Sequence, residues 1–503
     1  MNIDKLLERL SYTVIREGNT KEITGFSVNT KNVTPGCAFI CIKGARFDAH
    51  TCISTIDEYG AALIVISDEY AAGGFDASGI SATVISVPDT RLAKAMIAAA
   101  WYGYPAEKMV TVGITGSKGK TTTTHMLSDI ISRAGNKVVT IGTNGFILDG
   151  HVTELANTTP DSEDIQKYLA QAADAGCTHA VIECSSQGLM QHRTGGFTFD
   201  YGIFTNISEG DHVGPNEHKS FEEYLFCKGL LLKGSKQAVV YAGDGHIDDL
   251  LKDVDTPTIF YADDQKTYRK PDYIASGIKE TYENDLPGIA FDISGGFNAH
   301  INVNLPGRFN VCNAMAAVVV AHLLGISESV MNEALTHLKI KGRFDMILRT
   351  KELSVCVDFA HNGYSTRNHL EALREYRPKR IVCVFGADGN RSKHRRYEMG
   401  EASGRLADFS IITSGHNRYE AFETILADIM IGMNKTKAAE EKNYLVIKDR
   451  KEAVRYAIEN AKEGDLITIL GLGHESYQEE NGVKTPYSDT EYAREVLRSL
   501  GKM

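Results

Sequence analysis

Residues 110–124 read V-T-V-G-I-T-G-S-K-G-K-T-T-T-T. The β-branched run at 110–115 predicts a buried strand, and the glycine-rich turn at 116–119 ends it. A helix is expected from Lys120, because apolar residues then recur at helical spacing and Gly135 supplies a stop. The stretch therefore predicts a strand, a glycine turn and a helix in direct succession.

A glycine-rich turn between a strand and a helix is typical of a phosphate-binding loop. Glycines let successive backbone N–H groups turn toward phosphate oxygens, and the helix N-terminus adds partial positive charge. Lys120 is expected to reach the β- and γ-phosphates, and the Thr121 hydroxyl to ligate Mg²⁺. The pattern is T-G-x-x-G-K-T, because Ile114 stands where the strict motif has its first glycine. An ordinary glycine-rich turn is the alternative. We predict that ATP is bound by Thr115, Gly116, Ser117, Lys118, Gly119, Lys120, Thr121 and Thr122.

The composition of the chain is that of a soluble globular protein. Its 503 residues suggest about three domains, and 43% hydrophobic with 24% charged residues can build a sizeable core. The net charge of −11 argues against nucleic acid or an anionic membrane surface as a partner. The sequence has no apolar leader and no run of about 18 apolar residues, so a cytoplasmic protein is expected. The nine cysteines lack C-x-x-C pairing, which favours reduced packing residues.

The order of strand and helix signals divides the chain into three α/β parts. Residues 1–108 are expected to form a smaller N-terminal α/β domain. Residues 109–340 alternate strands with helices, which predicts a central doubly wound parallel sheet. Within that part, residues 253–304 favour an antiparallel excursion and residues 310–324 an apolar helix. Residues 341–503 predict a C-terminal, Rossmann-like domain.

Polar residues follow two strands of the predicted central sheet. Glu183 comes at the end of the strand expected at 179–184, and Asp211-His212 come shortly after the strand expected at 201–205. Ligands of doubly wound sheets bind at this edge, and a carboxylate beside a phosphate loop suits Mg²⁺. A solvated strand end and a structural histidine are the alternatives. Tyr224 and Lys228 share one face of the next helix, where a lone lysine is usually a solvated charge.

The motifs of the whole chain follow one another in a fixed order: T-G-x-x-G-K-T, Thr158-Thr159-Pro160, Glu183-Cys-Ser-Ser, Arg193, Thr205-Asn206-Ile207, Asp211-His212, Tyr224-x-x-x-Lys228, Asn310-x-x-Asn313, Gly342-Arg343, Asp358-x-x-His361, Arg391 and Gly473-His474-Glu475. This order resembles that of the Mur ligases, and among them the ligases that extend the UDP-muramoyl dipeptide by one amino acid. The resemblance covers nearly the whole chain. It implies ATP-dependent ligation in peptidoglycan synthesis through an acyl phosphate, with Mg²⁺.

The resemblance also implies roles for residues around the nucleotide. Lys120, Glu183, His212 and Lys228 would be catalytic. The metal ligands would be Thr121, Glu183, His212 and a carbamoylated Lys228. Carbamoylation turns a cation into a carboxylate-like oxygen ligand, which suits a second Mg²⁺. Asn313 would lie at the adenine, with Arg343 and Asp358 facing the nucleotide.

The remaining implied residues belong to the two other substrates, the UDP-linked muramoyl dipeptide and a free amino acid. The N-terminal domain would bind the UDP moiety through Thr30, Lys43 and His50. The muramoyl group would lie near Thr158, Thr159, Ser185 and Arg193. The C-terminal domain would bind the amino acid through Arg391, Arg418, Gly473 and Glu475.

One departure from the family's pattern leaves the amino acid open. The D-N-P-R-x-E stretch that accompanies meso-diaminopimelate stands here as residues 415–420, G-H-N-R-Y-E, which keeps only Arg418 and Glu420. Arg418 can pair with any α-amino acid carboxylate, so meso-diaminopimelate, L-lysine and similar acceptors all fit. A diverged ligase with another carboxylate and amine is the second hypothesis, and a non-catalytic nucleotide-binding protein is the third. A monomer is the default expectation.

Overall fold

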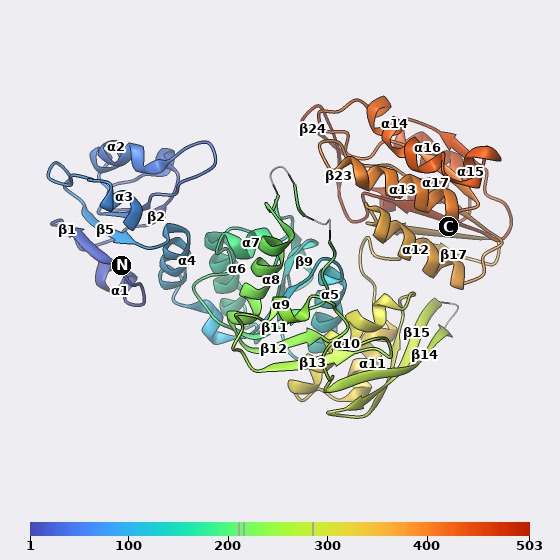
Figure 1. Ribbon diagram of the computed structural model, residues 1–503, viewed down its shortest axis with the longest axis horizontal. Helices are drawn as coiled ribbons and strands as arrows, with labels where there is room; N and C mark the ends of the chain where they lie inside the picture. Colours follow the sequence, from blue (N-terminus) through green and yellow to red (C-terminus); the bar gives the residue numbers. More distant parts are fainter. Residues whose placement is uncertain (210–211, 215–216, 284–285) are drawn as a thin grey trace. The chain divides into compact units, whose positions relative to one another are not determined.

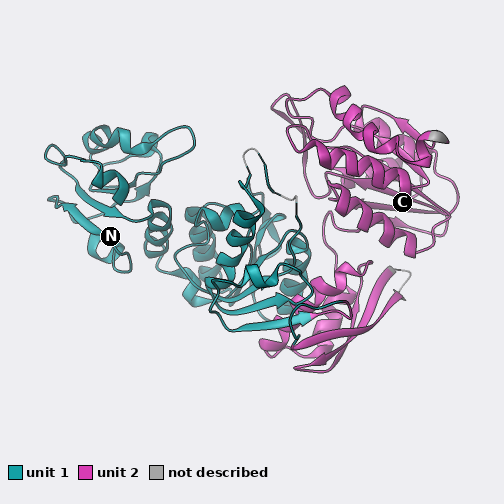
Figure 2. Cartoon of the chain, viewed as in Figure 1, with its two compact units in different colours: residues 1–261, 266–271 teal, residues 262–265, 272–503 magenta. Residues whose placement is uncertain are grey.

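The computed structural model describes residues 1–503 except 210–211, 215–216 and 284–285. The chain forms two compact units. The first comprises residues 1–261 and 266–271, and the second comprises residues 262–265 and 272–503 (Figure 2).

The first unit begins with a five-stranded sheet in the order β1-β5-β4-β3-β2. Strands β2 to β5 run parallel, and β1 is antiparallel to β5. Alternate strand residues pack on opposite faces: Leu63 and Val65 lie in one core cluster, Ile64 and Ile66 in the other. The elements are α1 (Ile3–Leu6), β1 (Thr13–Arg16), β2 (Phe26–Ser27), η1 (Thr30–Asn32), β3 (Ala38–Ile40), η2 (Ala49–Cys52), α2 (Ile53–Glu58), β4 (Leu63–Ser67), α3 (Asp68–Ala72), β5 (Thr83–Val87), α4 (Thr90–Trp101) and η3 (Pro105–Lys108).

A second sheet of the first unit contains the phosphate loop. Its strands are arranged β13-β12-β11-β6-β10-β7-β8-β9, parallel from β13 to β7 and antiparallel at β8 and β9 (Figure 1). The predicted strand, turn and helix are confirmed as β6 and α5, at the centre of the sheet. The strands are β6 (Val110–Thr115), β7 (Val138–Gly142), β8 (Gly145–Leu148), β9 (His151–Thr153), β10 (His179–Glu183), β11 (Phe199–Phe204), β12 (Ser235–Tyr241) and β13 (Thr258–Ala262).

Helices connect these parallel strands and cover both faces of the sheet. Helix α6 packs on one side with Ile165 and Leu169, and α8 supplies Tyr224 and Leu232 to a cluster on the other. The helices are α5 (Lys120–Arg133), α6 (Ser162–Asp174), α7 (Ser186–Met190), α8 (Phe221–Lys233) and α9 (Ile247–Leu250). The expected antiparallel excursion at 253–304 is wrong at its start, because β13 pairs parallel with β12. Apolar residues at 258–262 serve either direction of pairing, so periodicity alone does not separate the two.

The second unit begins with an antiparallel ribbon and two helices. Strands β14 (Tyr273–Glu283), β15 (Leu286–Gly295) and β16 (Ala299–Val303) pair in sequence. The apolar segment forms α10 (Phe309–Leu323), whose residues from Val318 to Ala321 are fully buried, and α11 (Glu328–Thr336) follows. This part confirms the remainder of the antiparallel excursion and the apolar helix.

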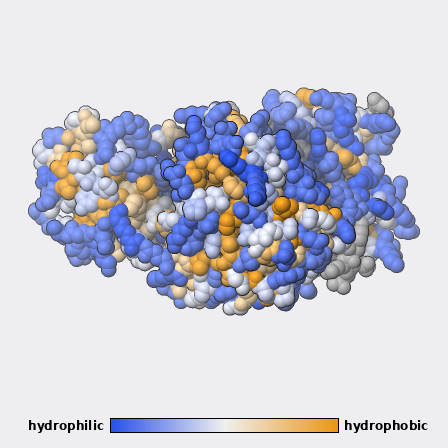
Figure 3. All heavy atoms as spheres, turned by 60° about the horizontal axis from the view of Figure 1, so that its bottom comes forward, coloured by the Kyte–Doolittle hydropathy of each residue, from blue (hydrophilic) through white to orange (hydrophobic). Residues whose placement is uncertain are grey.

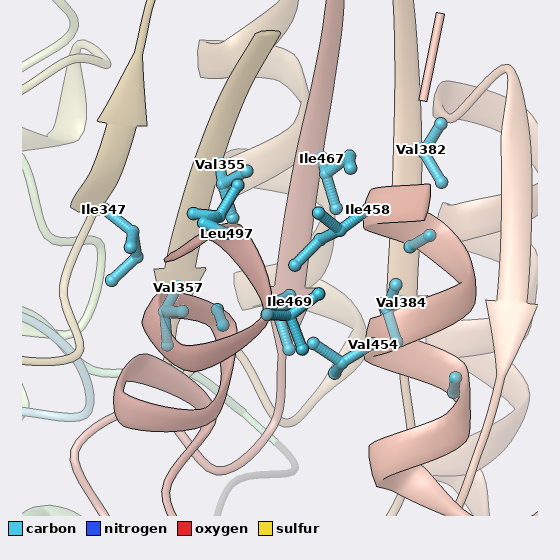
Figure 4. Packing of buried hydrophobic residues seen from close by; sticks show 14 of the residues in the cluster. Ile347, Val355, Val357, Val382, Val384, Val454, Ile458, Ile467, Ile469 and Leu497 are labelled. Atoms are coloured by element: carbon cyan, nitrogen blue, oxygen red, sulfur yellow. The ribbon is translucent and has the colours of Figure 1, made fainter. Parts of the chain in front are cut away.

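The Rossmann-like sheet of the second unit has the order β17-β18-β22-β19-β20-β21. Only β17 is antiparallel among these strands. Valine and isoleucine side chains from β18, β19 and β22 pack against α16 and α17 (Figure 4). The elements are β17 (Asp345–Arg349), β18 (Leu353–Asp358), α12 (Gly363–Glu375), β19 (Arg380–Phe385), α13 (Lys393–Leu406), β20 (Phe409–Ile412), α14 (Phe422–Met433), α15 (Lys437–Glu440), β21 (Tyr444–Val446), α16 (Arg450–Glu459), β22 (Asp465–Leu470), β23 (Tyr477–Glu480), β24 (Val483–Pro486) and α17 (Asp489–Ser499). The expectation of an α/β fold built on parallel sheets is confirmed.

Hydrophilic residues dominate the face seen in Figure 3, with smaller groups of hydrophobic residues between them. In the part of the chain that the structure describes, no helix is long and apolar enough to cross a membrane.

Candidate active site

The phosphate loop is held in shape by the end of the neighbouring strand β11. Asn206 accepts hydrogen bonds from the backbone N–H of Ser117, through its carbonyl at 2.8 Å, and of Lys118, through its side chain at 3.0 Å. The Thr205 hydroxyl donates to the Lys118 carbonyl at 2.6 Å. A Cβ at Gly116, whose φ is +152°, would lie 1.9 Å from that hydroxyl oxygen, so only glycine fits. The loop is a preformed backbone cradle rather than an ordinary exposed turn.

Lys120 and Thr121 open helix α5 directly after this cradle. The Lys120 ammonium donates to the Gly116 carbonyl at 2.8 Å, so its charge lies over the loop. The Thr121 hydroxyl donates to Glu183 Oε2 at 2.9 Å. The structure thus brings together three of the predicted residues, from the loop and from the end of β10.

The Glu183 carboxylate is almost fully buried, at 1% exposure. It also accepts from Thr143, through the backbone N–H at 2.9 Å and the hydroxyl at 3.0 Å. A Cβ at Gly142 would lie 2.3 Å from Glu183 Oε1, so this glycine makes room for the carboxylate. A hydroxyl and a carboxylate side by side at a phosphate loop match the oxygen ligands that Mg²⁺ prefers.

A second group of predicted residues surrounds Tyr224 on α8. The Tyr224 hydroxyl lies 2.8 Å from Ser117 Oγ, which also accepts from the Ser208 N–H at 3.0 Å. The Lys228 ammonium lies 4.5 Å from the centre of the Tyr224 ring, and the His212 ring centre lies 5.6 Å from it. Lys228 is buried, whereas the His212 side chain is 44% exposed. Asp211 lies outside the described residues.

Tyr224→Phe is expected to lower kcat/KM for ATP about fivefold, because it removes the hydroxyl that lies against Ser117 in the loop, a loss of about 1 kcal/mol. Steady-state phosphate release checks this. Tyr261→Phe is the matched control, since Tyr261 is equally buried and donates to the Phe204 carbonyl at 3.3 Å. Equal losses in the two variants would contradict a role for Tyr224 in the loop.

The described residues contain no group of three or more His, Cys, Asp or Glu side chains that could hold a metal ion. The predicted metal set needs only two such residues, with Thr121 and Lys228 as the others. Cysteines beside the site are poor nucleophiles: burial raises the pKa of Cys227 to about 11 and raises that of Cys184 further.

The residues predicted near the muramoyl group form one connected network. The Thr159 hydroxyl lies 2.8 Å from the Glu183 carbonyl and accepts from the Ser185 N–H at 2.8 Å. Arg193 donates to the Thr159 carbonyl at 2.8 Å. Thr158 joins through the Thr143 hydroxyl at 3.1 Å. The network therefore continues directly from the Glu183 carboxylate.

The residues predicted for the UDP moiety follow the carboxyl ends of parallel strands in the N-terminal sheet. Thr30 comes after β2 and is half-buried, and Lys43 comes after β3 and is exposed. His50 is 3% exposed; its Nδ1 lies 2.6 Å from Asp48 Oδ1, and its Nε2 accepts from the Ser67 N–H at 3.1 Å. Both ring nitrogens of His50 therefore make contacts within the N-terminal sheet and its loops.

The second unit contains the residues predicted to face the nucleotide from the linker. Asp358 accepts from the Phe344 and Ala360 N–H groups, both at 2.8 Å, so its carboxylate organises this turn. The Arg343 guanidinium lies 4.8 Å from the centre of the Phe359 ring. Asn313 is buried on α10 and donates to Asn310 at 3.0 Å.

The residues predicted for the amino acid gather at the carboxyl edge of the C-terminal sheet. Arg418 has a φ of +51° and lies 3.3 Å from the carboxylate of Asp388. Asp388 and Arg391 line one small cavity, together with His361, Ser392 and Arg395. Glu475 accepts a hydrogen bond from His416 at 2.8 Å. Gly473 has a φ of +52°, and a Cβ there would lie 2.6 Å from that of Phe359.

Sequence reasoning missed three residues of these clusters. Thr143 follows the end of β7, so the strand-end rule that singled out Glu183 could have found it. Asp388 similarly follows β19. Arg396 lies on α13, is 1% exposed and binds both Glu420 and Asp428 at 2.8 Å. Its hydrogen bond lowers the pKa of Glu420, and no sequence pattern marks this arginine.

Comparisons with known proteins agree with this arrangement. Residues 114–321 match the Mur ligase middle domain, and residues 342–473 match the Mur ligase glutamate ligase domain. A UDP-N-acetylmuramoyl-L-alanyl-D-glutamate--2,6-diaminopimelate ligase from Caldanaerobacter subterraneus subsp. tengcongensis is 35% identical over 503 residues, which are 100% of both chains.

Solved structures show the same fold. A structure of UDP-N-acetylmuramoyl-L-alanyl-D-glutamate--2,6-diaminopimelate ligase aligns over 100% of both chains with a TM-score of 0.69 and 24% identity. The MurF ligase from Thermotoga maritima in complex with ADP aligns over 94% of this chain and 97% of its own, with a TM-score of 0.57 and 19% identity. The matches to both family domains agree with the phosphate loop and the Thr121–Glu183 pair, and they show that the chain belongs to the Mur ligase family.

Proposed function

We propose that the chain is an ATP-dependent, ADP-forming ligase that joins an amino acid to UDP-N-acetylmuramoyl-L-alanyl-D-glutamate in peptidoglycan synthesis. The observation that carries the proposal is the cradle with Lys120 over it and Thr121 hydrogen-bonded to buried Glu183. The name of the relative that matches the full length supports the choice of substrate. ADP in the MurF complex supports the nucleotide.

The reaction has two steps. A carboxylate oxygen of the UDP-linked dipeptide attacks the γ-phosphorus of ATP, which breaks the bond to the β-phosphate and gives ADP and an acyl phosphate. The amine of the amino acid then attacks the acyl carbon, the amine proton passes to solvent and phosphate leaves. Lys120 and the backbone N–H groups of the loop offset the repulsion between carboxylate and triphosphate. In this proposal Arg193 and Ser185, which both contact Thr159, bind the acyl substrate.

Magnesium is part of the proposal. Bound Mg²⁺ would neutralise phosphate charge. Thr121 and Glu183 would hold one ion, and His212 with a carbamoylated Lys228 would hold a second. Lys228 is buried beside Tyr224, whose hydroxyl lies 2.8 Å from Ser117 of the phosphate loop, and this place near the loop supports Lys228 as a member of the metal set.

Carbamoylation of Lys228 is expected to appear as one carbamate carbon signal in the NMR spectrum of protein equilibrated with ¹³C-bicarbonate. The signal should be absent in Lys228→Met, because the lysine nitrogen is gone. Lys233→Met, an exposed neighbour on the same helix, should keep it. A signal unchanged in Lys228→Met, or absent from the unaltered protein, would contradict the proposal.

The boundaries 1–108, 109–340 and 341–503 are our proposal for the substrate, ATP and amino acid domains. The acceptor is proposed to be meso-diaminopimelate, since the relative's name contains 2,6-diaminopimelate, with L-lysine and L-ornithine as the competing amino acids. The departures at residues 415–417 favour testing all three. A diverged ligase with another pair of substrates is the second candidate.

The test is product formation by purified protein with ATP, Mg²⁺, the UDP-dipeptide and each amino acid in turn. One amino acid should stimulate phosphate release and yield a UDP-tripeptide of the matching mass. Protein that binds ATP yet makes no product with any of them would overturn the proposal and favour the diverged ligase.

A further inference from the structure

His416 lies in the loop after β20, and its side chain packs against the segment that leads into β23. Its imidazole is 3% exposed. Nε2 lies 2.8 Å from Glu475 Oε2, and the Glu479 N–H donates to Nδ1 at 3.0 Å. The Tyr477 ring packs against the imidazole, with ring centres 5.0 Å apart and an angle of 34° between the planes. Three residues of segment 475–479 thus surround one side chain.

These contacts determine which nitrogen carries the proton. A backbone N–H can only donate, so Nδ1 must be the acceptor and bears no hydrogen. The single proton of the neutral ring is then on Nε2, where it is donated to the Glu475 carboxylate. The Glu475 side chain is 20% exposed, so a small ligand can reach part of it.

We propose that His416 is a positioning residue for the acceptor amino acid: it fixes the Glu475 carboxylate, and Glu475 receives the ammonium group of that amino acid. This inference rests on the proposed function. A donor held at 2.8 Å leaves the carboxylate little freedom to rotate, and an oriented acceptor loses less entropy on binding. Arg418, two residues later, is held to the same segment because its N–H donates to the Glu479 carbonyl at 3.1 Å.

Two substitutions separate positioning from simple packing. In His416→Gln, the amide nitrogen stands near the place of Nε2 and can still donate to Glu475, while the tie to Glu479 is lost. In His416→Asn, the amide oxygen stands near the place of Nδ1 and can still accept from Glu479, while the donor to Glu475 is lost. Each variant therefore keeps one of the two hydrogen bonds of the imidazole and removes the other.

We expect His416→Asn to raise KM for the acceptor amino acid about tenfold or more, which is the usual cost of losing a hydrogen bond to a charged group. KM for ATP and for the UDP-dipeptide should stay within about twofold of the unaltered value, because neither substrate contacts Glu475 in the proposal. His416→Gln should keep KM for the amino acid within about threefold. Equal KM values in the two variants, or a larger rise in His416→Gln, would overturn the proposal.

The hydrogen bonds of His416 to Glu475 and Glu479 can also be tested by NMR, without measuring turnover. In protein labelled with ¹⁵N-histidine, the signal of His416 is identified by its loss in His416→Asn, and it should show a protonated Nε2 and an unprotonated Nδ1. The opposite tautomer would overturn the pairing. If the unaltered protein makes no UDP-tripeptide with any amino acid, the proposed function fails and the acceptor role of Glu475 fails with it. A failure confined to the His416 variants leaves the proposed function standing.

Discussion

Lys120→Met should reduce ATP-dependent phosphate release on the order of 10³-fold, as expected for loss of a cation at a transferring phosphoryl group. In the structure the ammonium lies over the cradle, 2.8 Å from the Gly116 carbonyl. Methionine keeps the length of the side chain but carries no charge, so the repulsion between the acyl carboxylate and the γ-phosphate is no longer offset. Single-turnover phosphate release with saturating substrates measures the effect on the chemical step.

Lys236→Met is the control for this variant. Lys236 is the second residue of β12, at the amino end of that strand, and its exposed ammonium pairs with Asp200 at 2.8 Å. The substitution removes one positive charge from the same unit without touching the loop, so phosphate release should stay within about twofold. A Lys120→Met protein that keeps more than about a tenth of the activity would show that this lysine does not neutralise the transition state.

Glu183→Gln should lower kcat about 100-fold and shift the Mg²⁺ dependence to higher concentration, because an amide is a weaker ligand for a hard cation. The carboxylate accepts three hydrogen bonds, from Thr121 and from the backbone and hydroxyl of Thr143. The amide nitrogen cannot accept, so the substitution also disturbs the Thr121 hydroxyl. Phosphate release titrated with MgCl₂ separates the weaker metal affinity from the lower maximal rate.

Asp200→Asn is the control for Glu183→Gln. Both substitutions replace a carboxylate by an amide, but Asp200 lies near the start of its strand and Glu183 at the end of its strand. Asp200 lies near the start of β11, and accepts from the Thr111 N–H at 2.8 Å and hydroxyl at 3.2 Å. Its neutral variant should lose stability but keep the Mg²⁺ dependence of the unaltered protein. An identical Mg²⁺ dependence in Glu183→Gln would rule out Glu183 as a metal ligand.

The parallel core of the fold was predictable because local signals agree there. Residues 110–135 combine a β-branched run, a glycine turn and helical spacing, and the structure has β6 and α5 at these positions. The pairing direction of β13 was not predictable, because a short apolar run fits parallel and antiparallel neighbours equally. The hairpin of β23 and β24 was missed since half-buried and exposed residues carry little periodicity.

For the candidate site, the sequence indicates which polar residues follow the ends of strands, but not which side chains contact one another. It places Glu183 and Thr121 at one sheet edge, and their 2.9 Å contact agrees. The family resemblance implies that His50 contacts the UDP moiety, and the sequence does not show that its ring nitrogens lie against Asp48 and the Ser67 N–H. It cannot show that His416 meets Glu475, since 59 residues separate them and the contact depends on how two loops pack.

Oxygen transfer tests the acyl phosphate most directly. The UDP-dipeptide is labelled with ¹⁸O in both oxygens of the reacting carboxylate and incubated with ATP, Mg²⁺ and the amino acid that stimulates turnover. We expect one ¹⁸O in each phosphate released and one in the new amide, because the oxygen that attacks phosphorus leaves with it. Phosphate without ¹⁸O, formed while ATP is consumed, would contradict the acyl phosphate mechanism and show that the chain cleaves ATP without activating this carboxylate.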